Sequence, residues 1–95
     1  MIPREIRDRR EEILELANRF GMTDVRLFGS RARGTPSKDS DVDFIVQVQP
    51  GHSLLDLLSF EVAVETLLGC PVDVVSERGL PEAISQEIRR ECIPL

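Results

Sequence analysis

Two aspartates separated by one residue offer the clearest chemistry in this sequence. Asp41 and Asp43 begin the segment 41–49, in which polar and apolar residues alternate. Because residues i and i+2 of a strand point the same way, both carboxylates are expected on one face of a half-buried strand. Mg²⁺ prefers hard oxygen ligands and takes one or two carboxylates together with substrate phosphate oxygens. The pattern indicates a magnesium site, and the alternative is a pair of acids exposed to water at a strand end.

A short segment containing glycine and arginine precedes the two acids. Gly29 and Ser30 follow the β-like run 25–28, and Arg31 and Arg33 come next. A glycine after a strand lets the backbone approach a ligand closely, and backbone N–H groups at a helix start bind phosphate. Alone, Gly29-Ser30 would indicate a turn between two strands. Together with the acid pair, which follows within 15 residues, the segment predicts a site for a nucleoside triphosphate and Mg²⁺.

These residues carry a resemblance to a known family. The segments Gly29-Ser30-Arg31-Ala32-Arg33-Gly34 and Ser40-Asp41-Val42-Asp43-Phe44-Ile45-Val46 resemble the signature of the DNA-polymerase-β-like nucleotidyltransferases. Within that superfamily the sequence is most similar to the minimal nucleotidyltransferases (MNT). The likeness extends over nearly the whole chain in length and element order, and its specific signal lies in residues 29–46. The larger Phe44, where the family often has a small aliphatic residue, is a neutral change on a buried face.

The resemblance implies a role for each site residue. Gly29 and Ser30 would hold the β- and γ-phosphates of ATP, and Arg33 would be a further nucleotide-binding residue. A third acid, Asp73, lies in the later predicted strand 71–76 and would complete the second of two Mg²⁺ sites while helping to activate the attacking hydroxyl. The implied catalytic and metal-binding acids are Asp41, Asp43 and Asp73, of which Asp41 and Asp43 also contact the nucleotide.

The same resemblance implies the reaction and the partner. MNT proteins resemble the antitoxin partners of HEPN-domain RNases, so transfer of AMP from ATP to a tyrosine of such a toxin is expected. The chain has no room for an acceptor-binding domain, so another molecule must present the acceptor. A second hypothesis is a non-catalytic antitoxin that masks the toxin by binding, which needs no acids. A third, nucleotidylation of a small molecule, fits poorly because no substrate-binding domain is present.

Hydrophobic periodicity predicts the elements that position these residues. An amphipathic helix is predicted over residues 4–20, and a last helix begins at Pro81 with Leu80, Ile84 and Ile88 on one face. Ser53, with Asp56 as a loose capping box, predicts a helix running to Leu68. Its broad apolar stripe contains Leu54, Leu57, Leu58, Val64, Leu67 and Leu68.

Residues 1–95 are therefore expected to form a single α/β (α+β) domain with the nucleotidyltransferase fold. Strands at 25–28, 41–49 and 71–76 would form a small mixed sheet of about three strands, with helices packed on it. The edges of so small a sheet need covering, which favours a homo-oligomer or a hetero-oligomer with the toxin.

Composition excludes several other classes of protein. The net charge of −5 argues against non-specific nucleic-acid binding. No apolar run approaches the roughly 18 residues of a membrane span, and the charged N-terminal segment is not a secretory signal, so a cytoplasmic protein is expected. Cys70 and Cys92 lack metal-ligand spacing, and His52 reads as a solvated loop residue. Arg89 and Arg90 suit a helix C-terminus and require no other role.

Overall fold

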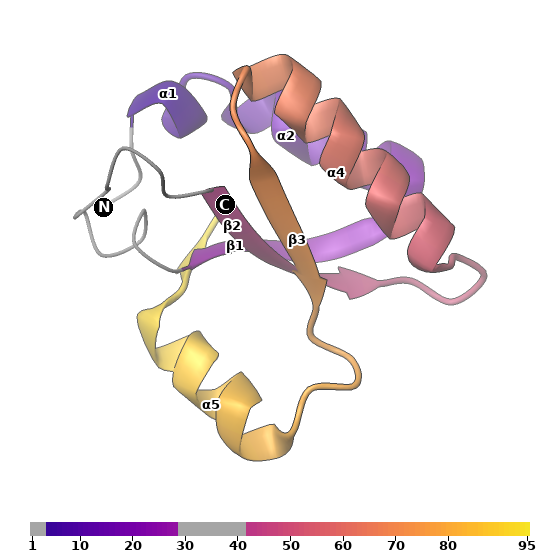
Figure 1. The fold of residues 1–95 in the computed structure, drawn as a ribbon, viewed down its shortest axis with the longest axis vertical. Helices are drawn as coiled ribbons and strands as arrows, with labels where there is room; N and C mark the ends of the chain where they lie inside the picture. Colours follow the sequence, from indigo (N-terminus) through magenta and orange to yellow (C-terminus); the bar gives the residue numbers. More distant parts are fainter. Residues whose placement is uncertain (1–3, 29–41) are drawn as a thin grey trace.

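The computed structural model of the protein describes residues 4–28 and 42–95. Its helices and strands follow one another along the chain as shown in Figure 1. The helices are α1 (Arg4–Arg7), α2 (Arg10–Phe20), α4 (Leu54–Leu68) and α5 (Glu82–Glu91). The strands are β1 (Met22–Phe28), β2 (Val42–Val48), β3 (Val72–Ser76) and β4 (Ile93–Pro94). No helix in this part of the chain is long and apolar enough to cross a membrane.

The strands form one mixed sheet in the order β3-β2-β1-β4. Strand β1 is antiparallel to both β2 and β4, whereas β2 and β3 are parallel and α4 connects them. The predicted α/β class with a small mixed sheet is confirmed. The sheet has one strand more than the three expected. The additional strand, β4, was not predicted because it is only two residues long and produces no alternation in the sequence.

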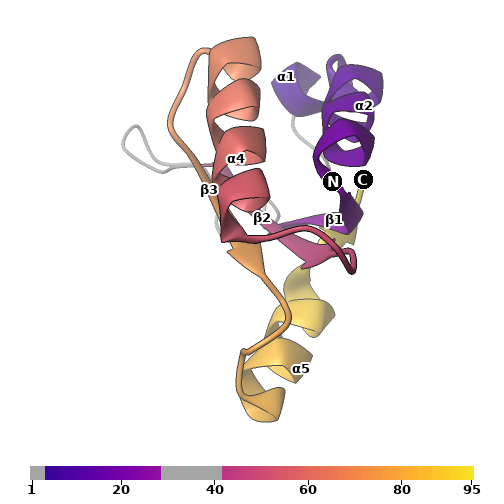
Figure 2. The same cartoon turned by 90° about the vertical axis from the view of Figure 1, so that its right-hand side faces the viewer.

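Helices cover the two faces of the sheet unequally. Figure 2 shows that, of the described helices, α1, α2 and α4 lie on one face and α5 lies on the other. The main core lies under the first group, where Ile6, Ile13 and Phe60 are fully buried against the sheet. Strand β2 contributes Val42, Phe44 and Val46 to this core, as its alternation predicts. Ile45 points to the other face and is still only 2% exposed, on the side where α5 lies.

Helix α4 has the predicted ends. Ser53 Oγ accepts a hydrogen bond from the Leu55 N–H at 3.2 Å, and the Asp56 carboxylate accepts one from the Ser53 N–H at 3.0 Å. At the other end Gly69 adopts the left-handed conformation, with φ of 71°, which glycine tolerates without strain. The expected apolar stripe is wrong in part, because Leu54 and Leu58 are 70% and 49% exposed. The helix is apolar on two sides, and only one side faces the core.

Three other expected boundaries differ from the structure. The single helix predicted over 4–20 is interrupted between α1 and α2, where the Arg9 N–H bonds to the Ile6 carbonyl at 3.1 Å and tightens the turn. Strand β1 begins at Met22 rather than at residue 25, since its pairing with β2 continues across an irregularity between Thr23 and Arg26. The last helix begins at Glu82, after Pro81, and buries none of its residues.

Candidate functional site

Sheet pairing brings two of the predicted catalytic acids together. Asp43 is the second residue of β2, Asp73 is the second residue of β3, and the two are direct partners in the parallel register. Register partners in neighbouring strands point to the same face and lie about 4.8 Å apart. Asp43 is half-buried and Asp73 is exposed. Two carboxylates that are 30 residues apart in the sequence therefore stand side by side on the face of the sheet opposite the main core.

The end of β1 lies beside the same two residues. Phe28, the last residue of β1, pairs with Asp43 in the antiparallel register. Phe28, Asp43 and Asp73 therefore form one row across three strands. In the sequence, Gly29 follows Phe28 directly, and Asp41 immediately precedes the first residue of β2. The predicted site residues Gly29, Ser30, Arg33 and Asp41 lie outside the residues that the structure describes.

Alternation along β2 determines which way Asp43 points. Its neighbours Val42 and Phe44 are 1% and 0% exposed, so they fix the opposite face of the strand in the core. A one-residue slip of β2 would bury the carboxylate and expose these apolar side chains, at a large cost in free energy. The core therefore holds Asp43 on the face of the sheet opposite the main core, which we call the open face. Alternation in the sequence predicts this orientation.

Glu61 of α4 supports the strand that carries Asp73. Its carboxylate oxygen Oε1 accepts a hydrogen bond from the backbone N–H of Val74, the residue after Asp73, at 3.1 Å. Strand β3 lies at an edge of the sheet, so this N–H is not used in the ladder with β2. Glu61 was not among the site residues predicted from the sequence. The available signal was an acidic residue beside Phe60, in the middle of a largely apolar helix.

Polar contacts attach α5 to the open face. Glu77, which follows β3, accepts hydrogen bonds from the side chains of Gln47, Ser85 and Arg89, the last at 2.6 Å. Arg89 also lies 3.6 Å from an Asp24 carboxylate oxygen. The interpretation of Arg89 as a residue that merely suits the helix end is therefore incomplete, because Arg89 ties α5 to β1 and to the segment after β3.

Arg26 extends this network along β1. Its guanidinium donates to Cys92 Sγ at 3.6 Å and to the Asp24 carboxylate at 2.9 Å. The hydrogen bond to Cys92, followed by the one to Asp24, raises the pKa of Arg26 above its ordinary value. Arg26 pairs with Pro94 of β4, so β4 lies beside the part of β1 that carries this charge. The network attaches α5 and β4 to β1, and Arg26 lies two positions along β1 from Phe28, the register partner of Asp43.

The acid pair suits a hard divalent cation. Within residues 4–28 and 42–95, no group of three or more His, Cys, Asp or Glu side chains is arranged to hold a metal ion. Asp43 and Asp73 supply a pair of carboxylates, and the third predicted ligand, Asp41, lies outside those residues. Mg²⁺ sites in phosphate-processing proteins commonly use one or two carboxylates of the protein together with phosphate oxygens of the substrate. Asp43 and Asp73 can supply the carboxylates.

The chain is similar over most of its length to several known proteins. The model of the nucleotidyltransferase domain family matches residues 6–94. The protein adenylyltransferase MntA of Thermococcus cleftensis is 39% identical over 79 residues, which are 83% of this chain and 80% of the relative. A solved structure of a protein provisionally assigned as a minimal nucleotidyltransferase is 46% identical, with a TM-score of 0.90 and coverage of 100% of this chain and 97% of the other.

A more distant solved structure shares the fold. It contains a tri-AMPylated HEPN toxin from Shewanella oneidensis in complex with an MNT antitoxin. The chain that matches is 17% identical with a TM-score of 0.69, and the alignment covers 93% of this chain and 69% of that chain. At 17% identity this likeness shows a shared fold and nothing more.

Proposed function

Since the chain belongs to the nucleotidyltransferase domain family, we propose that it transfers AMP from ATP to a hydroxyl group of a partner protein. The observation that carries the proposal is the register pairing of Asp43 with Asp73, next to the strand end that leads into Gly29-Ser30. Like charges at this spacing repel each other, so the pairing of the two carboxylates does not by itself favour folding. Their placement on the open face of the sheet is accounted for by a catalytic role.

The proposed reaction is a substitution at the α-phosphorus of ATP. The acceptor oxygen bonds to that phosphorus while the bond to the bridging α–β oxygen breaks, and pyrophosphate leaves with the bond's electron pair. Asp73, which is exposed, helps the acceptor hydroxyl lose its proton. Gly29 and Ser30 hold the β- and γ-phosphates, and Arg33 adds a positive charge that favours the nucleotide. Positioning and charge neutralisation supply most of the rate enhancement in phosphoryl-group chemistry of this kind.

Mg²⁺ is the proposed cofactor, held by Asp43 and Asp73 together with Asp41. When bound, two such ions neutralise charge on the attacking and leaving oxygens of the substitution. The two described carboxylates come from neighbouring strands whose register is fixed by core residues on the opposite face. The chain therefore supplies a rigid pair of ligands rather than one that must assemble on binding.

The proposed acceptor is a tyrosine of a HEPN-domain toxin. The 39% identical relative from Thermococcus cleftensis is named a protein adenylyltransferase, which supports a protein as the acceptor. The Shewanella oneidensis complex, in which an MNT antitoxin accompanies an AMPylated HEPN toxin, supports this kind of partner. In this proposal the chain silences the toxin by modifying it. The competing proposal, silencing by binding alone, gives the acid pair no task.

Two differently labelled nucleotides test the reaction. The protein encoded beside this one is incubated with the chain, Mg²⁺ and ATP labelled at either the α- or the γ-phosphate. Label from α-³²P-ATP alone is expected on the partner, because AMP is transferred and pyrophosphate leaves. The Asp43→Asn and Asp73→Asn variants should transfer at most about a hundredth as much label. The control Glu11→Gln, which changes an exposed acid on α2, should transfer as the unmodified chain does. Label from γ-³²P-ATP would instead indicate a kinase.

A further inference from the structure

An exposed apolar surface runs along the outer side of α4. Leu55, Leu58 and Val62 are 75%, 49% and 62% exposed. Their spacing of three and four residues places them on one side of the helix, opposite the core residues Leu57, Phe60 and Val64. Large aliphatic side chains gathered on one helix side mark interaction sites more often than isolated ones do. We call this the α4 surface, defined by Leu55, Leu58, Ser59, Val62 and Ala63.

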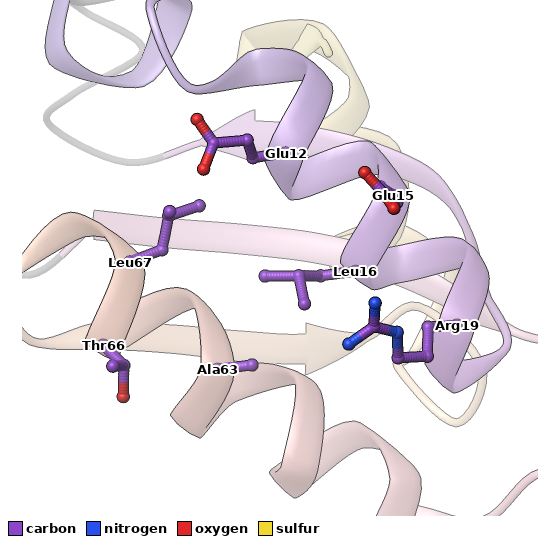
Figure 3. A pocket seen from close by; sticks show the side chains of 7 residues that line it. All are labelled: Glu12, Glu15, Leu16, Arg19, Ala63, Thr66 and Leu67. Carbon is purple, nitrogen blue, oxygen red and sulfur yellow. The ribbon is translucent and has the colours of Figure 1, made fainter.

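A groove between α4 and α2 continues this surface. The hollow over the α4 surface has a volume of about 640 Å³, and Ala63 also lines the neighbouring groove of about 320 Å³. Figure 3 shows Leu16 of α2 and Leu67 of α4 pointing into the space between the two helices. The apolar area therefore extends from the outer side of α4 into the groove between α4 and α2. An elongated groove between two helices suits a helix better than it suits a small molecule.

The charges that flank the apolar area are mostly acidic. Glu12 and Glu15 of α2 line the groove, and Arg19 is the one basic residue among its lining residues. Glu12 lies 3.0 Å from Arg9, but both side chains are half exposed, and such pairs contribute only about 0–1 kcal/mol and exchange partners readily. On the other edge of the α4 surface, helical spacing places Glu65. Acids therefore stand on both flanks.

This charge distribution favours one kind of binding partner for the α4 surface. Helix α4 contains Asp56, Glu61 and Glu65 and no Lys or Arg. Two copies packed through α4 would bring these acidic flanks against each other, which opposes a homodimer. A helix with basic residues on both sides of an apolar stripe would match both the apolar α4 surface and the acidic residues that flank it.

We propose that the α4 surface docks an amphipathic helix of another protein, whose apolar stripe is flanked by Lys and Arg. Apolar side chains of that helix lie over Leu55, Leu58 and Val62, and its cations lie near Glu12, Glu15 and Glu65. The α4 surface is on the opposite face of the sheet from Asp43 and Asp73, so its occupant leaves the acid pair uncovered. The inference does not depend on AMP transfer, because it concerns a surface that the proposed chemistry does not use.

A displayed library of helical peptides tests the proposal. Each peptide carries a fixed leucine stripe at i, i+3, i+4 and i+7 spacing, and its flanking positions are randomised among Lys, Glu and Gln. Selection on the full-length chain should enrich Lys at the flanks at least tenfold over Glu. Neutral or acidic flanks among the selected peptides, or no enrichment at all, would overturn the proposal.

Two variants assign the binding to this surface. Leu58→Gln/Val62→Gln should lose at least tenfold in affinity for a selected peptide, and Ile84→Gln, at an exposed position on α5, should bind it unchanged. Because all three positions are exposed, the variants are expected to fold, which circular dichroism checks. Equal binding by both variants would overturn the assignment. Sedimentation that shows a dimer of the chain, dissociated by Leu58→Gln/Val62→Gln, would identify a second copy as the occupant and contradict the proposal.

Discussion

At the scale of single residues, the site depends on which face of the sheet each acid occupies. Alternation in β2 predicts the orientation of Asp43, because the apolar residues on either side of it are held in the core. Asp73 is different, since a lone aspartate in a short strand carries no information about its pairing partner. Its place beside Asp43 follows from the β2–β3 register, which is a tertiary property. Only the family resemblance could indicate it from the sequence.

Replacing Asp73 with Asn should separate catalysis from stability. We expect AMP transfer to fall by roughly a hundredfold or more, as when a group that stabilises the transition state is removed. The free energy of unfolding should stay unchanged or rise, because the repulsion from Asp43 is lost. Initial transfer rates and urea denaturation measure the two effects. An Asp73→Asn chain that is folded and nearly as active as the unmodified one would contradict the proposed role of this residue.

Glu61 should position the strand that carries Asp73 through one hydrogen bond. In Glu61→Gln the side-chain carbonyl still accepts from the Val74 N–H, whereas Glu61→Ala leaves that N–H without this acceptor. We expect Glu61→Ala to lose about 1 kcal/mol of unfolding free energy and to lower kcat for transfer, and Glu61→Gln to restore most of both. Urea denaturation and transfer kinetics provide the measurements. Identical behaviour of the two variants would show that the hydrogen bond has no positioning effect.

At the scale of elements, the features that depend on neighbouring residues could be predicted from the sequence, and the features that depend on tertiary packing could not. Ser53, Asp56 and Gly69 define the ends of α4 because capping depends only on neighbouring residues. The break between α1 and α2 gives no such signal, because Ile6 and Ile13 keep the helical spacing through it. The sequence also leaves open which side of α4 is buried, since a helix that is apolar on two sides has no single stripe. Packing against the sheet decides that question in favour of Leu57, Phe60 and Val64.

Two substitutions on α4 should therefore differ greatly in cost. Phe60 is fully buried, and Phe60→Ala should lower the unfolding free energy by about 3–5 kcal/mol through lost burial and a cavity. Val62 is 62% exposed, and Val62→Ala should change it by less than about 0.5 kcal/mol. Urea denaturation of both variants gives the comparison. A large loss of stability in Val62→Ala would mean that the outer side of α4 is buried in solution.

Helix α5 should be the least firmly attached helix of those described, because it buries no residue. Its attachment passes through Glu77, whose side chain accepts from Ser85 and Arg89 of the helix. Hydrogen bonds to charged groups contribute about 1.5–3 kcal/mol each. Glu77→Ala should therefore speed amide hydrogen exchange in residues 82–91 by tenfold or more while leaving α2 and α4 unchanged. Unaltered exchange in α5, or a uniform increase over the whole protein, would contradict this view, and Glu11→Ala is the matched control.

At the scale of the whole molecule, the sheet separates two surfaces with different properties. One face is covered by α1, α2 and α4 and has the exposed apolar α4 surface on its outer side. The other face carries Asp43 and Asp73 and, among residues 4–28 and 42–95, α5 is the helix that covers it. The fold class was predictable because the order of elements restricts the architecture. The strand order was not, since β4 and its pairing with β1 follow from long-range contacts of Ile93 and Leu95.

We propose that this chain attaches AMP to a partner protein by means of its acid pair. The most direct test is the intact mass of the protein encoded beside it after incubation with the chain, ATP and Mg²⁺. We predict a gain in whole steps of one AMP, absent when the chain carries Asp43→Asn/Asp73→Asn. A partner that binds the chain tightly and gains no mass, or one that gains the same mass with the double variant, would contradict the claim.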